Sequence, residues 1–164
     1  MLNNSNIGYF YIKMGGIIMG LKKKVSNNDV SKKLEKNKDK IKERFKMTKK
    51  EAEEILKDKE KTEEKLNEAR DKIDKLGDGP IKNAIDDLFL FISIVKAWIK
   101  GEYREIPIGT IIGIFGALIY FVSPVDVIPD FIPGIGYIDD IFIISLVVKQ
   151  AHSDLQRYKA WMEK

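Results

Sequence analysis

Four aspartates around a turn rich in proline and glycine form the grouping with the greatest chemical potential in this sequence. They are Asp126, Asp130, Asp139 and Asp140. Clustered carboxylates and exposed backbone carbonyls are the oxygen ligands that Mg²⁺ and Ca²⁺ prefer. The pattern therefore permits a site for a divalent cation or a polar head group, and a metal-dependent membrane enzyme is one alternative function.

The same aspartates have a structural interpretation, which we favour. Asp139 and Asp140 precede a predicted helix, where carboxylates cap free N–H groups and offset the helix dipole. Asp126 and Asp130 can fix the turn by accepting hydrogen bonds from nearby amides. On this interpretation the four residues shape the chain and bind nothing.

The sequence offers few residues for other kinds of catalytic or metal site. The chain has no cysteine and a single histidine, His152, so a disulfide framework is excluded and a zinc site has almost no ligands. We find no pairing of a nucleophile with a base and no glycine-rich phosphate loop. Neither an enzymatic activity nor a cofactor is predicted, beyond the divalent cation that the aspartates permit.

Charge is distributed unevenly along the chain. Residues 22–50 hold thirteen basic and four acidic side chains, whereas residues 51–79 hold seven basic and eleven acidic ones. The basic stretch predicts contact with anionic lipid head groups, with a merely solvated helix as the alternative. Its only aromatic ring is Phe45. A single ring offers little surface on which nucleic-acid bases could stack. A soluble bundle whose basic arm binds nucleic acid is therefore the less favoured function.

The charged half of the chain predicts helices, since residues 29–76 contain no glycine or proline. Thr48 and Glu51 have the spacing of a capping box, which predicts a new helix there after a break near Lys46. A weak heptad pattern, strongest over residues 48–76, predicts self-association through a coiled coil. The alternative is a helix that packs one apolar stripe on its own domain.

The second half of the chain is far more apolar. An amphipathic helix is predicted over residues 81–99, and the twenty residues 106–125 carry no charge. Twenty helical residues can cross a hydrocarbon core of about 30 Å, and Gly109, Gly113 and Gly116 would suit close helix packing. The apolar run 141–148 is too short to cross alone but could complete a hairpin. The alternative is a buried central helix in a soluble bundle.

Residues 101–107 (GEYREIP) and 120–140 (YFVSPVDVIPDFIPGIGYIDD) resemble the YkvA-like family, a family that carries a numbered domain of unknown function. The resemblance runs from about residue 52 to residue 161 and does not cover the basic stretch. It implies a small helical membrane protein and implies no activity.

Together these observations predict an all-α protein, with a charged N-terminal helix or weak coiled coil before a helical domain containing an apolar membrane hairpin. Residues 1–20 are poorly structured or precede the true start at Met19, residues 21–79 form the charged extension, and residues 80–164 form the membrane domain. The turn 123–140 has no basic residue, whereas basic residues flank both apolar segments. This predicts a multi-pass or re-entrant hairpin in the membrane, with both termini cytoplasmic and a structural or interaction role.

The two interpretations of the aspartates differ in one measurement. The structural interpretation predicts that Mg²⁺, Mn²⁺ and Ca²⁺ leave the melting temperature unchanged. A cation-dependent rise that disappears when all four aspartates are replaced by asparagine would establish the metal site instead.

Overall fold

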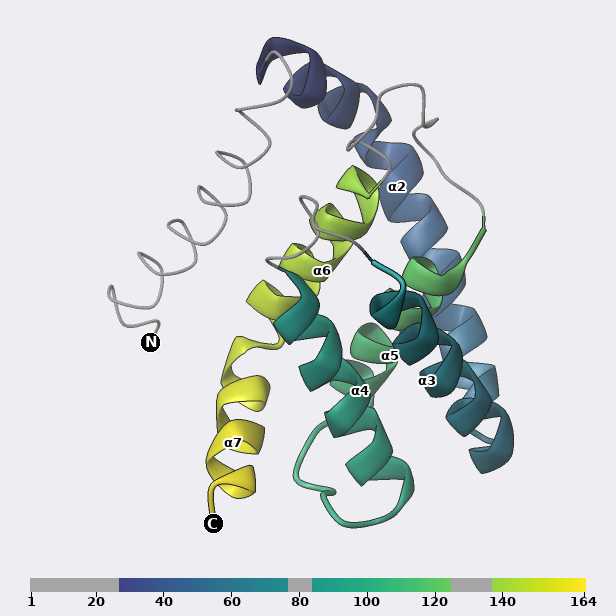
Figure 1. Ribbon diagram of the computed structural model, residues 1–164, viewed down its shortest axis with the longest axis vertical. Helices are drawn as coiled ribbons and strands as arrows, with labels where there is room; N and C mark the ends of the chain where they lie inside the picture. Colours follow the sequence, from purple (N-terminus) through teal and green to yellow (C-terminus); the bar gives the residue numbers. More distant parts are fainter. Residues whose placement is uncertain (1–26, 77–83, 125–136) are drawn as a thin grey trace.

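The computed structural model describes residues 27–76, 84–124 and 137–164, which form six α-helices and no strand. This confirms the all-α class. The helices are α2 (Asn27–Ile55), α3 (Lys59–Asp74), α4 (Ile85–Ile99), α5 (Ile108–Val122), α6 (Ile138–Gln150) and α7 (His152–Met162). Figure 1 shows α2 running along one side of the bundle and α7 at the opposite side.

The predicted helix break near Lys46 is wrong. Helix α2 continues through Ile55, and Thr48 is buried within it, where its hydroxyl donates a hydrogen bond to the Phe45 carbonyl at 3.0 Å. Because this side chain bonds back to its own helix, it caps no new one. The break falls ten residues later, where Asp58 caps α3 by accepting a hydrogen bond from the Lys61 amide at 3.2 Å.

Helix α5 lies at the centre of the bundle and packs against α2, α3, α4 and α6. It carries no charged residue, and every residue from 114 to 121 is buried. Pro107 precedes its first turn and Pro124 follows its end, so the helix has 15 residues. The sequence alternative of a buried central helix therefore describes α5 in this structure.

The turn of the predicted membrane hairpin, residues 125–136, lies outside the described residues, and the structure describes its two arms. At a rise of 1.5 Å per residue, α5 is about 22 Å long, shorter than a hydrocarbon core of about 30 Å. Among the described residues, no helix combines the length and the apolar character that a bilayer crossing requires. The second apolar run lies in α6, which packs on α5 and α2. Much of the apolar surface that suggested lipid contact is covered by the chain's own helices, whereas Ile108 at the start of α5 is 53% exposed.

The charged helices contribute to the same core as the apolar ones. Ile41 and Phe45 of α2 and Leu66 and Ile73 of α3 are buried with residues of α4 to α7 in one cluster. Both predicted units, residues 21–79 and 80–164, thus supply core side chains. Most residues of the heptad pattern face this core, which favours packing within the chain. Self-association through residues 48–76 would have to use other faces and stays a prediction.

Close helix packing is found at one of the three predicted glycines. A Cβ atom added to Gly116 would lie 2.8 Å from Cγ, 3.2 Å from Cα and 3.3 Å from the backbone nitrogen of Lys49 in α2. The same atom added to Gly109 or Gly113 would meet nothing within 4 Å. Only Gly116 is needed to bring α5 and α2 together.

This difference predicts opposite effects of two glycine substitutions. Gly116→Ala should lower the free energy of unfolding by about 1–3 kcal/mol, because α5 and α2 must separate. Gly113→Ala, its matched control, should raise it by about 0.5–1 kcal/mol, because alanine favours a helix where space is open. Urea unfolding followed by circular dichroism measures both. Equal effects would contradict the close contact.

Candidate functional site

A buried polar cluster lies where α5 ends and α6 begins. The Tyr120 hydroxyl of α5 donates a hydrogen bond to Oδ2 of Asp139 in α6 at 3.0 Å. Both residues are buried, with 3% and 1% of their surfaces exposed. A carboxylate so far from solvent requires a donor, and Tyr120 supplies one.

The two described aspartates occupy the first turn of α6. The residue before this helix is Tyr137, whose side chain makes no capping hydrogen bond. The predicted position of the two residues before the helix is wrong, because Asp139 and Asp140 lie inside it, and their capping role stays a prediction. Their charges still oppose the positive end of the helix dipole there. Asp140 is buried as well.

Arg44 brings α2 into the cluster. Its Nη2 donates a hydrogen bond to the Ser123 hydroxyl just beyond α5, at 2.5 Å. Its Nε is buried and has no hydrogen-bond partner in the described part of the chain, and the same is true of Oδ1 of Asp139. The cluster therefore contains a buried donor and a buried acceptor with unused capacity.

Lys72 adds a second cation from α3. Its Nζ donates to the Phe121 carbonyl and lies over the Phe121 ring, 4.6 Å from the centroid. The same Nζ lies 5.7 Å from the centroid of the ring of Tyr137, the residue before α6. Arg44 and Lys72 thus place two positive charges at the C-terminal end of α5, where the helix dipole is negative.

The electrostatics keep the Tyr120 hydroxyl protonated, as a hydrogen-bond donor. Burial, followed by the neighbouring charge of Asp139, raises the pKa of Tyr120 far above its ordinary value. The hydroxyl keeps its proton throughout the physiological range. The described cluster therefore holds hydrogen bonds and charge, and its tyrosine is not an activated nucleophile.

The predicted cation site is only partly within the described structure. Asp139 and Asp140 are adjacent and buried in α6, whereas Asp126 and Asp130 lie outside the described residues. Over residues 27–76, 84–124 and 137–164, no three residues of His, Cys, Asp or Glu are grouped so that they could hold a metal ion. A site formed by all four aspartates stays a prediction.

Sequence reasoning missed three members of this cluster. Arg44 and Lys72 looked like two of many basic surface residues, and their contacts span 79 and 49 positions. Tyr120 gave a usable signal, because a tyrosine within an apolar helical run needs a partner for its hydroxyl. Nothing local identified Asp139 as that partner.

Comparison with known proteins bears on the segment that contains this cluster. The sequence pattern of a family described as "Protein of unknown function (DUF1232)" matches residues 110–146. The uncharacterized membrane protein YkvA of Bacillus subtilis is 31% identical over 80 residues, which cover 49% of this chain and 76% of that protein. The chain belongs to the YkvA-like family. No solved structure matches.

Membership confirms the resemblance drawn from the sequence. Tyr120, Ser123, Asp139 and Asp140 lie inside residues 110–146, the segment that matches the DUF1232 pattern, and Arg44 and Lys72 lie outside that segment. The cluster therefore joins the family segment to α2 and α3. The family is one of unknown function, and its description assigns no activity to these residues.

The Tyr120–Asp139 bond yields a stability prediction. Tyr120→Phe should lower the free energy of unfolding by about 1–3 kcal/mol, because it removes the donor from a buried carboxylate. In the double variant with Asp139→Asn, the loss should be smaller than the sum of the single losses, since both residues share one bond. Strictly additive losses in urea unfolding would contradict the coupling.

The raised pKa of Tyr120 also predicts a pH dependence. In the unfolded chain a tyrosine loses its proton near pH 10, its ordinary pKa, whereas folded Tyr120 keeps it. The unfolded state then binds fewer protons, so the free energy of unfolding falls as pH rises above about 10. Tyr120→Phe should reduce this slope without abolishing it, because burial also raises the pKa of Tyr103 and Tyr158. An unchanged slope would contradict the assignment.

Proposed function

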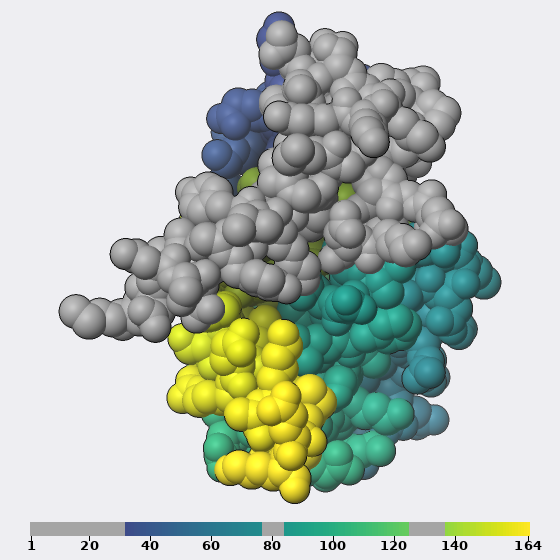
Figure 2. Space-filling model, turned by 60° about the vertical axis from the view of Figure 1, so that its left-hand side comes forward, coloured from purple at the N-terminus to yellow at the C-terminus, as the bar shows by residue number. Residues whose placement is uncertain are grey.

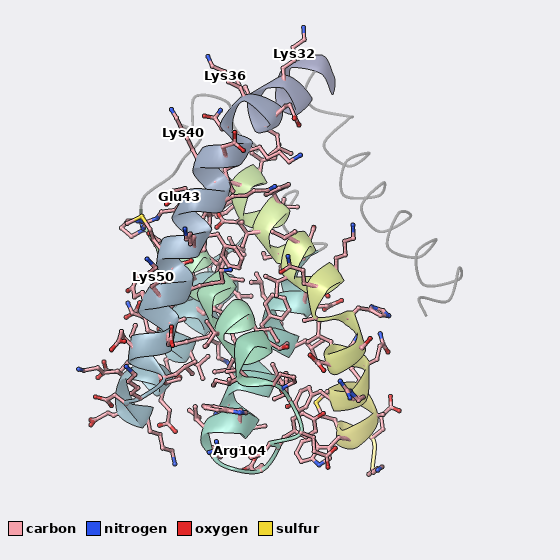
Figure 3. All side chains as sticks on the ribbon, turned by 180° about the vertical axis from the view of Figure 1, so that it is seen from behind. Lys32, Lys36, Lys40, Glu43, Lys50 and Arg104 are labelled. Carbon is pink, nitrogen blue, oxygen red and sulfur yellow. The ribbon has the colours of Figure 1, made fainter. Side chains whose placement is uncertain are left out.

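We propose that this protein is a membrane-associated interaction protein that attaches to anionic lipid through the basic outer face of α2. The observation that carries the proposal is the row of exposed lysines on that face. Lys32, Lys36 and Lys40 are spaced four residues apart, so they share one side of the helix. Figure 3 shows them pointing away from the bundle, with Lys50 further along.

The charge of this face supports the proposal. Residues 32–50 contain ten basic and three acidic side chains, a net charge of +7. The described ion pairs include one between residues of this stretch, Lys38 with Glu35 at 3.9 Å. Each basic residue near an anionic membrane surface contributes about 1 kcal/mol to binding. Several acting together suffice for reversible attachment.

Lipid is the favoured counter-charge rather than nucleic acid. Phe45, the one ring of the basic stretch, is buried with 4% of its surface exposed, so it cannot stack on a base. The exposed apolar residue on this part of α2 is Met47, with 56% of its surface accessible. The relative YkvA is described as a membrane protein, and a lysine-rich surface suits that location.

A surface attachment also keeps the bundle intact. The sequence prediction of an inserted hairpin with both termini cytoplasmic would require α5 to leave α2, α3 and α4. It would also expose the buried Tyr120–Asp139 pair to hydrocarbon or break it. Attachment through α2 needs neither change, and it leaves the other faces of the bundle free for partners.

Vesicle binding tests the proposal directly. The triple variant Lys32→Gln, Lys36→Gln, Lys40→Gln should bind vesicles of phosphatidylglycerol and phosphatidylcholine roughly a hundredfold more weakly, from about 1 kcal/mol per lysine. The matched control neutralises three exposed lysines elsewhere, Lys59, Lys75 and Lys159. Equal losses in the two variants would overturn the assignment to α2.

Membrane fractionation separates the proposal from insertion. Protein in membranes should be released by high salt, because screened charges hold it. Resistance to salt and to alkaline carbonate, with release by detergent alone, would support the inserted hairpin and overturn surface attachment.

A further inference from the structure

A half-open groove lies between α3 and α4, away from both the polar cluster and the basic face of α2. Its volume is about 470 Å³. Figure 1 shows the two helices side by side, in agreement with their contacts. In Figure 2 the teal atoms of α4 lie at the surface beside the yellow atoms of the C-terminal helix. We call it the α3–α4 groove.

Part of the groove lining is apolar, and the uncharged polar residues beside it are Asn67 and Ser93. Leu66 of α3 and Ile92 of α4 belong to the core, with 3% and 9% of their surfaces exposed. Phe89 is 39% exposed, one of four large apolar side chains that are exposed in the described structure. An exposed apolar side chain beside a few polar groups is a feature of ligand sites.

The groove is also bordered by cations. Arg70 of α3 and Lys96 and Lys100 of α4 are exposed lining residues, and none of them forms an ion pair with another residue of the described structure. Lysines elsewhere on α3 differ, since Lys61 and Lys65 each pair with a neighbouring carboxylate. The acidic lining residue is Glu63. The lining therefore carries a net charge of +2 at neutral pH.

Size and charge together define the class of ligand. A volume of this order suits a small molecule, and a helix of another protein, about 10 Å across, would need more room. A phosphate monoester carries a charge of about −1.5 to −2 at neutral pH, which matches the lining. The apolar residues require a hydrocarbon portion in the same ligand.

We propose that the α3–α4 groove binds a single-chain amphiphile with a phosphate head group. The hydrocarbon chain lies against Leu66, Phe89 and Ile92. The phosphate accepts hydrogen bonds from Arg70, Lys96 and Lys100, with arginine and lysine both suited to phosphate oxygens. This site is separate from α2, so it does not depend on the proposed attachment to membranes.

Titration calorimetry with monododecyl phosphate, kept below its micelle concentration, tests the proposal. The full chain should bind it at one site, at least about tenfold more tightly than inorganic phosphate, which lacks the chain, or dodecanol, which lacks the charge. Dodecanoate should bind more weakly, because it carries a single negative charge. Equal binding of dodecanoate would overturn the phosphate assignment, and binding no tighter than inorganic phosphate would overturn the site.

Two pairs of variants locate the binding. The first pair tests charge. The triple variant Arg70→Gln, Lys96→Gln, Lys100→Gln should weaken binding by about tenfold or more. The control that neutralises Lys59, Lys75 and Lys159 should leave binding unchanged. Phe89→Ser should weaken it as well, and Met47→Ser, which changes another exposed apolar residue outside the groove, should not. All of these side chains are exposed, so folding is retained and checked by circular dichroism. Equal binding by groove variants and controls would overturn the proposal.

Neither groove variant should alter vesicle attachment through α2. A loss of dodecyl phosphate binding with vesicle binding retained would support two separate sites. If the α2 variant and the groove variants lost dodecyl phosphate binding equally, the amphiphile would be held by general charge, and the groove assignment would fail.

Discussion

The structure depends on covering α5. This helix has no charged residue and almost no polar one, so each of its sides must be kept from water. Helices α2, α3, α4 and α6 all pack against it, and the rest of the fold follows from that requirement. The highly charged helices α2 and α3 take part because each keeps an apolar stripe, such as Ile41, Phe45 and Ala52 on α2, turned inward.

The polar cluster is the counterpart of this apolar centre. A buried helix end leaves carbonyl groups without partners, and Lys72 satisfies one of them at Phe121. Arg44 and the Tyr120–Asp139 bond connect the same end to α2 and α6. Three helices are therefore fixed relative to α5 by directed bonds, which select one arrangement where apolar contacts alone would permit several. This explains why a family segment of no known activity contains buried charges.

The sequence predicted the helices well and their environment less well. The all-α class, a helix within residues 106–125 and the apolar face of α4 follow from local composition. A long apolar run, however, has the same composition whether lipid or other helices surround it, so residues 106–125 could not reveal that α5 lies inside a bundle. The break between α2 and α3 was misplaced because Thr48 and Glu51 imitate a capping box, while the real cap, Asp58, stands in an ordinary charged stretch. The partners of Tyr120 and Arg44 depend on long-range packing, which no local pattern encodes.

The contact at Gly116 constrains how this sequence can change. Lys49 approaches Gly116 with its backbone nitrogen and Cα as well as with its side chain. Trimming the side chain at position 49 would remove the nearest atom, Cγ, whereas the backbone atoms at 3.2 and 3.3 Å would remain. A change at position 49 can therefore relieve only part of the crowding that a larger residue at 116 would meet. The freedom at position 116 depends on the path of the α2 backbone as well as on the side chain that this backbone carries.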